Sequence, residues 1–208
     1  MFFKKRNKGY EDYAWNETGK SPWLRSTGEF ILEIIKVVVI SLAIIIPVRF
    51  FIIQPFYVKG ASMEPNFYDH QYLIINEITY RFQGPQRGDI VVFRYPRDPN
   101  QYFIKRIIGL PGEKVEIKDG QVYIYNEQHP QGEALNEDAY LSISAKTFGD
   151  ELLQIGPNEY FVLGDNRSSS MDSRNFGPIS ADYLVGYAWL RGWPLDVLKV
   201  FRPPDYNL

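Results

Sequence analysis

Hydrophobic residues are distributed in two different ways along this chain of 208 residues. Between Ile34 and Ile53, 16 of 20 residues are apolar, without the alternation of a strand. Twenty helical residues span roughly 30 Å, the thickness of the hydrocarbon core of a bilayer. Lys36 and Arg49 lie near the two ends of this segment, where long basic side chains can reach opposite interfaces. The pattern therefore predicts one transmembrane helix over residues 30–53.

Two other interpretations of this segment stay open, because a buried core helix and a cleaved signal peptide are also apolar. Gly60-Ala61-Ser62 has the small-residue spacing of a cleavage site, but it lies too far beyond the apolar segment to be a typical one. Basic residues outnumber acidic ones in the polar tail 1–29, so the positive-inside rule places this tail in the cytosol. Residues 54–208 are then expected on the extracytoplasmic side, although Arg49 argues against that orientation.

Beyond the apolar segment, hydrophobic runs are short, and Gly and Pro residues separate them. In Lys114–Tyr125, apolar residues alternate with polar ones on both sides of Asp119-Gly120, which predicts a β-hairpin with a two-residue turn. Further short strands are predicted at Tyr72–Ile75, Asp89–Phe93, Tyr102–Ile108, Tyr160–Leu163 and Leu184–Leu190. Residues 54–208 are therefore predicted to form a mainly β, antiparallel domain, with the polar segment 127–150 as a surface excursion.

Composition and charge exclude several classes of function. The net charge is −2, and residues 54–208 carry 15 basic and 20 acidic residues, so nucleic-acid binding is disfavoured. Cysteine is absent, which excludes disulfides, thiolate metal sites and a cysteine nucleophile. His70 and His129 lack the spacing of a metal site, so no metal or other cofactor is expected. A Ser-His-Asp triad would have to use one of these two histidines.

A serine and a lysine are the candidate reactive groups. Ser62 lies between small residues that can form a sharp exposed turn, although an ordinary loop has the same pattern. A serine nucleophile needs a base, and a lysine can serve when burial lowers its pKa. Lys105 is the best candidate, because apolar residues crowd both sides of it. Side chains alternate along a strand, so Lys105 points inward if Arg106 faces solvent; a lysine on an exposed edge strand is the alternative.

Four sequence boxes occur in order and carry a resemblance to a known family. They are Gly60-Ala-Ser-Met-Glu-Pro65, Arg87-Gly-Asp-Ile-Val-Val-Phe93, Lys105-Arg-Ile-Ile-Gly-Leu-Pro-Gly-Glu113 and Gly164-Asp-Asn-Arg-Ser-Ser-Ser-Met-Asp-Ser-Arg-Asn-Phe-Gly177. In this order, and after one anchor, they resemble the motifs of type I signal peptidases, which are membrane-bound serine endopeptidases. The resemblance covers roughly Phe56 to Leu190 and implies the β-rich catalytic domain of that family, without a cofactor.

The resemblance also implies the roles of particular residues. Ser62 would be the nucleophile, Lys105 the general base, and Ser170 the residue that hydrogen-bonds and orients the lysine. Asp172 and Arg174 would form an ion pair that braces the site. The residues implied to line the substrate pockets are Phe56, Val58, Phe67 and Ile104.

Two departures from the family pattern concern the nucleophile turn. Many members have threonine where this chain has Asn66. Some members have a serine, whose hydroxyl completes the oxyanion hole, where this chain has Gly60. The oxyanion donors are therefore expected to be the backbone N–H of Ser62 and a backbone donor near Gly60.

The implied partners are preproteins that carry signal peptides, cut after A-x-A-like small residues, and the lipid bilayer. Proximity to the protein-translocation machinery is also expected. The alternative is a catalytically silent relative that binds signal peptides or organises a translocation complex. A self-cleaving repressor shares the Ser-Lys chemistry and the β fold, but this chain lacks the DNA-binding domain of such proteins.

Overall fold

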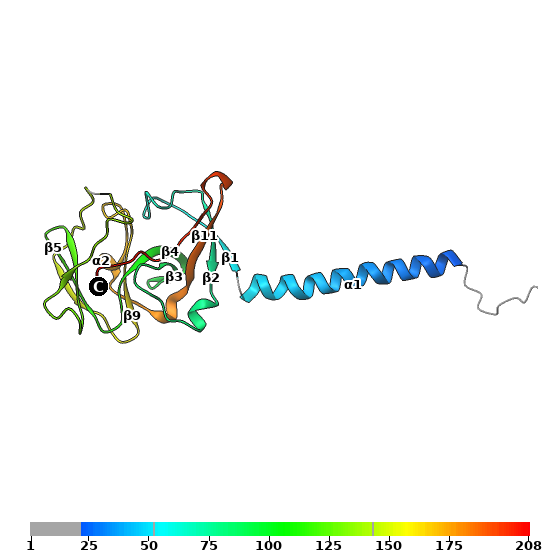
Figure 1. Ribbon diagram of the computed structural model, residues 1–208, viewed down its shortest axis with the longest axis horizontal. Helices are drawn as coiled ribbons and strands as arrows, with labels where there is room; N and C mark the ends of the chain where they lie inside the picture. The colour runs from blue at the N-terminus through cyan, green and yellow to red at the C-terminus, as the bar shows by residue number, and fades with distance from the viewer. Residues whose placement is uncertain (1–21, 52, 143) are drawn as a thin grey trace, which may run out of the picture. The chain divides into compact units, whose positions relative to one another are not determined.

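The computed structural model describes residues 22–51, 53–142 and 144–208. They form two compact units, which divide between Ile46 and Pro47. The helix α1 (Pro22–Phe51) runs through the first unit and slightly beyond it (Figure 1). Within α1, Thr27–Pro47 is a stretch of 21 mainly apolar residues, none of which is buried. This stretch is long and apolar enough to cross a membrane.

The bounds of α1 differ from the predicted transmembrane segment. The helix begins at Pro22 instead of residue 30 and ends at Phe51 instead of residue 53. Proline suits the first turn of a helix, where N–H groups have no intrahelical partner. The polar residues before the apolar run therefore continue the helix, which hydrophobicity alone does not indicate. The rest of the predicted cytosolic tail, residues 1–21, lies outside the described residues.

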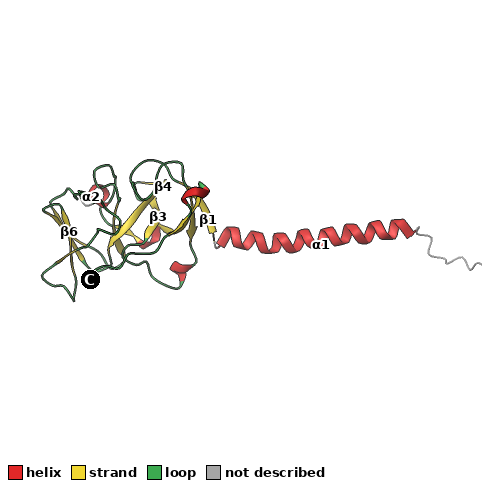
Figure 2. Ribbon diagram, turned by 45° about the horizontal axis from the view of Figure 1, so that its top comes forward, coloured by secondary structure: helices red, strands yellow, loops and turns green. Residues whose placement is uncertain are grey.

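The second unit consists mainly of antiparallel strands (Figure 2), which confirms the predicted fold class. Among the described residues, eight strands form a larger sheet in the order β1-β2-β11-β3-β4-β9-β10, with β12 paired to β11. These strands are β1 (Ile53–Tyr57), β2 (Tyr72–Asn76), β3 (Ile90–Tyr95), β4 (Asp98–Gly109), β9 (Glu159–Leu163), β10 (Ile179–Ser180), β11 (Leu184–Trp193) and β12 (Lys199–Val200). Short helices lie between them: η1 (Thr79–Arg81), α2 (Ser173–Phe176), η2 (Ala181–Tyr183) and η3 (Leu195–Val197).

A smaller sheet has the order β7-β6-β5-β8. Its strands are β5 (Lys114–Lys118), β6 (Gln121–Tyr125), β7 (Glu133–Ala134) and β8 (Glu151–Gln154). The predicted hairpin is confirmed, because Lys114 pairs with Tyr125 and the register continues to the turn. Asp119 and Gly120 both have positive φ angles, 53° and 83°, as a two-residue hairpin turn requires.

Strand β3 is buried on both faces of the larger sheet. Ile90 and Val92 belong to one hydrophobic cluster, whereas the alternating residues Val91 and Phe93 belong to another. A strand that is buried on both faces reads as a continuous apolar run, as this one does. Because β3 pairs with β4 along Ile90–Arg94, it gives β4 a rigid support.

The segment 127–150 is not simply a surface excursion, as its polarity suggests. Leu135 and Tyr140 are buried in a cluster with residues of the smaller sheet, and β7 lies within the segment. Asn207, near the C-terminus, donates hydrogen bonds to Glu133 and to the carbonyl of Ala134, so the chain end lies beside this sheet (Figures 1 and 2). Isolated apolar residues in a polar segment form no periodic pattern, so the sequence gives no sign of this packing.

Candidate active site

Ser62 lies on a turn that follows β1. The turn is anchored by Met63 and Phe67, whose side chains are fully buried, and by a hydrogen bond from the Phe67 N–H to the Met63 carbonyl. Asn166 also holds the turn by two hydrogen bonds. Its backbone N–H donates to the Ser62 carbonyl at 3.0 Å, and its side-chain amide donates to the Ala61 carbonyl at 3.0 Å. The Ser62 hydroxyl therefore projects from a fixed backbone.

Lys105 lies on β4 with its amine against the nucleophile turn. Its Nζ is 2.8 Å from Ser62 Oγ and 2.7 Å from the carbonyl oxygen of Ile104. A neutral amine can donate one N–H to this carbonyl and direct its lone pair at the serine hydroxyl. Neither His70 nor His129 contacts Ser62 in the described part of the chain. The geometry therefore fits a serine–lysine pair and not a serine–histidine pair.

The burial of Lys105 favours its neutral form. The residue is 3% exposed, and this burial lowers the pKa of Lys105 to about 8, although the charges of Asp172 and Asp165 act in the opposite direction. Burial penalises the ammonium because it removes the charge from water. At a pH near 8, a large fraction of Lys105 can therefore accept a proton.

The sequence pattern suggested that Lys105 points inward because Arg106 faces solvent. In the structure, Lys105 is buried but Arg106 does not face solvent. Both residues are 3% exposed. The Arg106 guanidinium donates to both carboxylate oxygens of Asp165, at 2.8 and 2.7 Å, and lies over the ring of Tyr140. Asn66, the residue that departs from the family pattern, also donates to Asp165. A charged residue can be buried in this way because its charge is paired.

Replacement of Arg106 by methionine is expected to destabilise the fold by about 3–5 kcal/mol, because it leaves the carboxylate of Asp165 buried without its cation. Chemical denaturation of the detergent-solubilised protein measures the change. Arg94→Met is the matched control, since Arg94 is exposed on the neighbouring strand β3. If the free energy of unfolding falls as little in Arg106→Met as in Arg94→Met, the ion pair between Arg106 and Asp165 does not stabilise the fold by the expected amount.

Ser170 lies close to the nucleophile turn, but its predicted hydrogen bond to Lys105 is not present. Its Oγ is buried and has no hydrogen-bond partner of normal geometry within the described part of the chain. A Cβ atom on Gly164 would lie 2.2 Å from Ser170 Oγ and 2.5 Å from the Ser62 carbonyl oxygen. Only glycine at this position therefore lets the Ser170 loop and the nucleophile turn approach each other this closely.

Asp172 and Arg174 form an ion pair at the end of the same loop. Arg174 donates to both carboxylate oxygens at 2.8 Å and also to the Arg167 carbonyl. Burial alone would raise the pKa of Asp172, but the hydrogen bonds and charge of Arg174 hold it below its usual value. Asp172 also accepts from the Gly164 N–H and caps the short helix α2. The pair thus fixes both ends of the loop that carries Ser170.

The backbone donors near the nucleophile differ in their availability. The Ser62 N–H has no hydrogen-bond partner among the described residues, so this donor is unused within the described part of the chain. The Gly60 N–H, in contrast, already donates to the Asp69 carboxylate at 3.0 Å. This corrects the expectation of a Gly60 donor, because a carboxylate acceptor occupies that N–H.

A groove of about 600 Å³ leads to Ser62 and Lys105. Three of the four predicted pocket residues line it: Phe56, Val58 and Ile104. The prediction for Phe67 is wrong, since its side chain is fully buried and packs on the ring of Phe201, with centroids 4.4 Å apart. Residues that line the groove but were not predicted are Tyr57, Lys59, Leu73, Val92, Asn100, Gln101, Tyr102, Phe103 and Met171.

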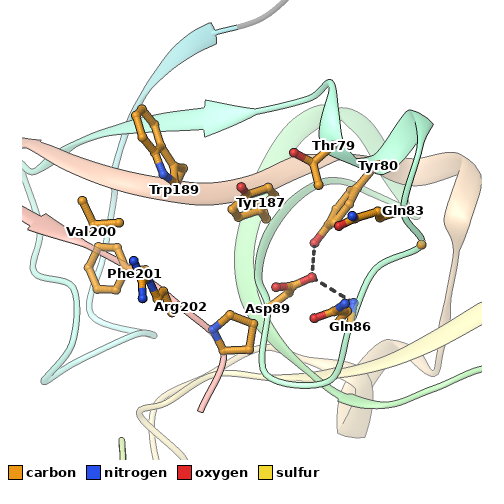
Figure 3. Close-up of a pocket in the computed structure, with 12 residues that line it drawn as sticks. Thr79, Tyr80, Gln83, Gln86, Asp89, Tyr187, Trp189, Val200, Phe201 and Arg202 are labelled. Carbon is orange, nitrogen blue, oxygen red and sulfur yellow. Dashed lines mark hydrogen bonds between the residues drawn. The ribbon is translucent and has the colours of Figure 1, made fainter. Parts of the chain in front are cut away.

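A separate pocket of about 260 Å³ shares no residue with this groove (Figure 3). At its base, Asp89 accepts hydrogen bonds from the Tyr80 hydroxyl at 2.8 Å and from the Gln86 N–H at 2.9 Å. Burial raises the pKa of Asp89 despite these bonds. The carboxylate therefore ties the turn before β3 to η1, and this structural role accounts for its burial.

Comparisons with known proteins identify the family of the chain. The sequence pattern of the family described as signal peptidase, peptidase S26, matches residues 31–193. A probable signal peptidase I-2 of Synechocystis sp. is 37% identical over 170 residues, which cover 79% of this chain and 74% of that protein. Signal peptidase IB of Staphylococcus aureus strain MRSA252 is 34% identical over 186 residues, which cover 84% of this chain and 96% of that protein. One similar solved structure is the crystal structure of a signal peptidase I from Enterococcus faecalis V583. Its sequence is 37% identical to this one, the match covers 50% of this chain and 97% of the crystallised chain, and the TM-score is 0.42.

In the β domain, a serine hydroxyl lies beside a buried lysine amine, which is the pairing of groups that a serine nucleophile with a lysine base requires. The extent of the sequence match then defines the family: the chain belongs to the signal peptidase family, peptidase S26. This membership supports a serine peptidase that acts in signal-peptide removal. The exposed apolar helix α1 fits a membrane-anchored protein.

Proposed function

We propose that this protein removes signal peptides from preproteins by serine–lysine catalysis, with Ser62 as nucleophile and Lys105 as general base. The observation that carries the proposal is the 2.8 Å separation of Lys105 Nζ and Ser62 Oγ at a lysine whose burial lowers its pKa. Activated nucleophiles need such a base within hydrogen-bond reach.

In the proposed reaction, the neutral amine of Lys105 takes the hydroxyl proton of Ser62 while Oγ attacks the scissile carbonyl. The unused Ser62 N–H stabilises the oxyanion that forms, and one such donor is commonly worth about 3 kcal/mol. The intermediate then expels the amine of the mature chain, which receives the proton from the Lys105 ammonium. Water hydrolyses the remaining ester to Ser62 and frees the signal peptide.

The groove supports an extended substrate with small residues at the first and third positions before the cleaved bond. Strand β1 is at the edge of the larger sheet, so a substrate strand can add beside it. Phe56, Val58 and Ile104 line the groove together with Ser62. Asp172 and Arg174 brace the loop of Ser170, which lies against the turn that the nucleophile occupies.

We further propose that the N-terminal tail is cytosolic and that the β domain lies on the extracytoplasmic face, in proximity to the translocation machinery. The excess of basic residues before α1 supports this orientation. A signal peptide is itself held in the bilayer, so its cleavage site emerges near the membrane surface. Ser62 follows the end of α1 by 11 residues, so the proposed nucleophile is close to the anchor in the sequence.

Cleavage of a purified preprotein by the detergent-solubilised protein tests the function. We expect one cut after a small-x-small sequence, located by mass spectrometry of both products. A leucine in place of either small residue should abolish the cut. If the wild type binds signal peptides but cleaves none of them, the silent-relative alternative is correct instead.

The pH dependence of cleavage follows from the pKa of Lys105. Only the neutral amine can act as base, and the pKa is about 8, so kcat/KM should fall by about tenfold for each pH unit below that value. At higher pH the neutral form dominates and this fall disappears. Initial rates between pH 5 and 9 measure the profile. A flat acidic side would contradict the role of Lys105 as base.

A further inference from the structure

The carboxylate of Glu137 lies in the segment 127–150, and no described residue of that segment lines the groove. Only 10% of the Glu137 side chain is exposed. One carboxylate oxygen accepts hydrogen bonds from Arg167 Nη2 at 2.5 Å and from the Tyr140 hydroxyl at 2.6 Å, and the other accepts from Arg167 Nη1 at 2.8 Å. Bonds between ionised groups in this forked geometry are strong and hold both partners in one orientation. Glu137 therefore fixes Arg167 and Tyr140, although none of the three lines the groove.

Arg167 connects Glu137 to the nucleophile turn. The Arg167 side chain is 2% exposed, and its Nε donates to the Gly164 carbonyl at 3.1 Å, so the guanidinium is bonded both to Glu137 and to its own loop. Asn166 is the preceding residue, and it makes the two hydrogen bonds that hold the turn of Ser62. Because Asn166 and Arg167 share a peptide bond, a displacement of the guanidinium moves the groups that hold this turn.

Tyr140 provides a second connection to the nucleophile turn. It lies on one turn with Glu137, because the Tyr140 N–H donates to the Glu137 carbonyl at 3.2 Å. The Tyr140 carbonyl accepts a hydrogen bond from the side-chain amide of Asn66 at 2.8 Å. Asn66 follows Ser62 by four residues. Two separate hydrogen-bonded routes therefore run from Glu137 to the turn that carries the nucleophile.

We propose that Glu137 is a positioning residue that holds the Ser62 hydroxyl against Lys105. It acts mainly through Arg167 and Asn166. This role rests on the proposed function, because it concerns the geometry of the same serine–lysine pair. A displacement of about 1 Å between reacting groups can cost a factor on the order of 100 in rate. Since Glu137 lies outside the groove, its loss should lower kcat and leave KM unchanged.

Replacement of Glu137 by glutamine tests this role on the full-length, detergent-solubilised protein. Glutamine has the same size, but it turns an amide NH2 instead of a second acceptor towards the Arg167 guanidinium. We expect kcat for cleavage of a preprotein to fall by about tenfold to a hundredfold, with KM unchanged. The midpoint of the acidic fall in kcat/KM should stay at about 8, because Lys105 stays buried. Loss of the local fold would instead hydrate Lys105 and move the midpoint towards 10.5.

Asp138→Asn is the matched control for Glu137→Gln. Asp138 is the next residue, is exposed, and has a side chain without a hydrogen bond or ion pair within the described part of the chain. Its replacement removes the same charge and should leave kcat and KM unchanged. Thr147→Val is a milder second variant, since Thr147 also accepts a hydrogen bond from the Arg167 guanidinium. It should lower kcat by about threefold without a change in KM.

The double variant Glu137→Gln/Asn166→Ala tests the route between Glu137 and the nucleophile turn. It should keep at least about threefold more activity than the product of the two single losses predicts, because both changes release the same turn. Losses that multiply would overturn this route. The kcat of the wild type in folded Glu137→Gln or, if this variant does not fold, in Thr147→Val would overturn the positioning role, as would a rise in KM alone. If the wild type cleaves no preprotein, the proposed function fails, and this role fails with it.

Discussion

Replacement of Ser62 by alanine is expected to lower kcat for signal-peptide cleavage by a factor on the order of 10⁴ to 10⁶, as removal of a serine nucleophile does in other serine peptidases. The oxygen that attacks the scissile carbonyl is then missing, and no other hydroxyl is within hydrogen-bond reach of Lys105 among the described residues. The groove is unchanged, so the variant should bind the substrate as well as the wild type does. Product formation and substrate affinity are measured separately.

Ser180→Ala is the matched control for Ser62→Ala. Ser180 lies on β10, caps η2 and lines no part of the groove. Its replacement should leave kcat unchanged. Cleavage by Ser62→Ala at the rate of Ser180→Ala would exclude Ser62 as the nucleophile.

Replacement of Lys105 by arginine is expected to lower kcat by at least about 10³-fold, although it preserves the positive charge. A guanidinium cannot be deprotonated in a protein, so it cannot take the proton of Ser62. Lys105→Met removes the base as well, but it also removes a buried amine that has no acidic partner within hydrogen-bond distance. The methionine variant should therefore be at least as stable as the wild type, which separates loss of chemistry from loss of folding.

The double variant Ser62→Ala/Lys105→Met tests whether the two residues act as a unit. Its residual rate should equal that of Ser62→Ala alone, because a base without its nucleophile contributes nothing. Losses that multiply would mean that Lys105 acts independently of Ser62. Rates are measured on the same substrate for all three proteins, and thermal unfolding checks that each protein is folded.

Local sequence patterns predicted much of the β domain. Alternation and an Asp-Gly turn located the hairpin of β5 and β6, and short apolar runs located β2, β3, β4, β9 and β11. The shorter strands β7, β10 and β12 have two residues each. An alternation of apolar and polar residues cannot be recognised in so short a strand. The helix start at Pro22 was missed because polar residues precede the apolar run.

The contacts of the site depend on residues far apart in the sequence, which periodicity cannot relate. Local pattern made Ser62 and Lys105 candidates only, since each also fits an ordinary loop or an edge strand, and their roles came from the resemblance to a family. The burial of Arg106 depends on its ion pair with Asp165, 59 residues later in the chain. The apolar residues around Arg106 in the sequence therefore could not indicate that its side chain is buried. The engaged N–H of Gly60 depends on the Asp69 side chain in the same way.

The titration of the Lys105 side chain tests the central claim most directly. Lysine labelled with ¹³C at the ε carbon reports its charge by NMR, and the signal that is missing in Lys105→Arg identifies Lys105. The ordinary pKa of lysine is 10.5, whereas burial should bring the midpoint of this signal to about 8. The same midpoint should appear in the pH profile of cleavage. A midpoint near 10.5 would contradict the assignment of Lys105 as the general base.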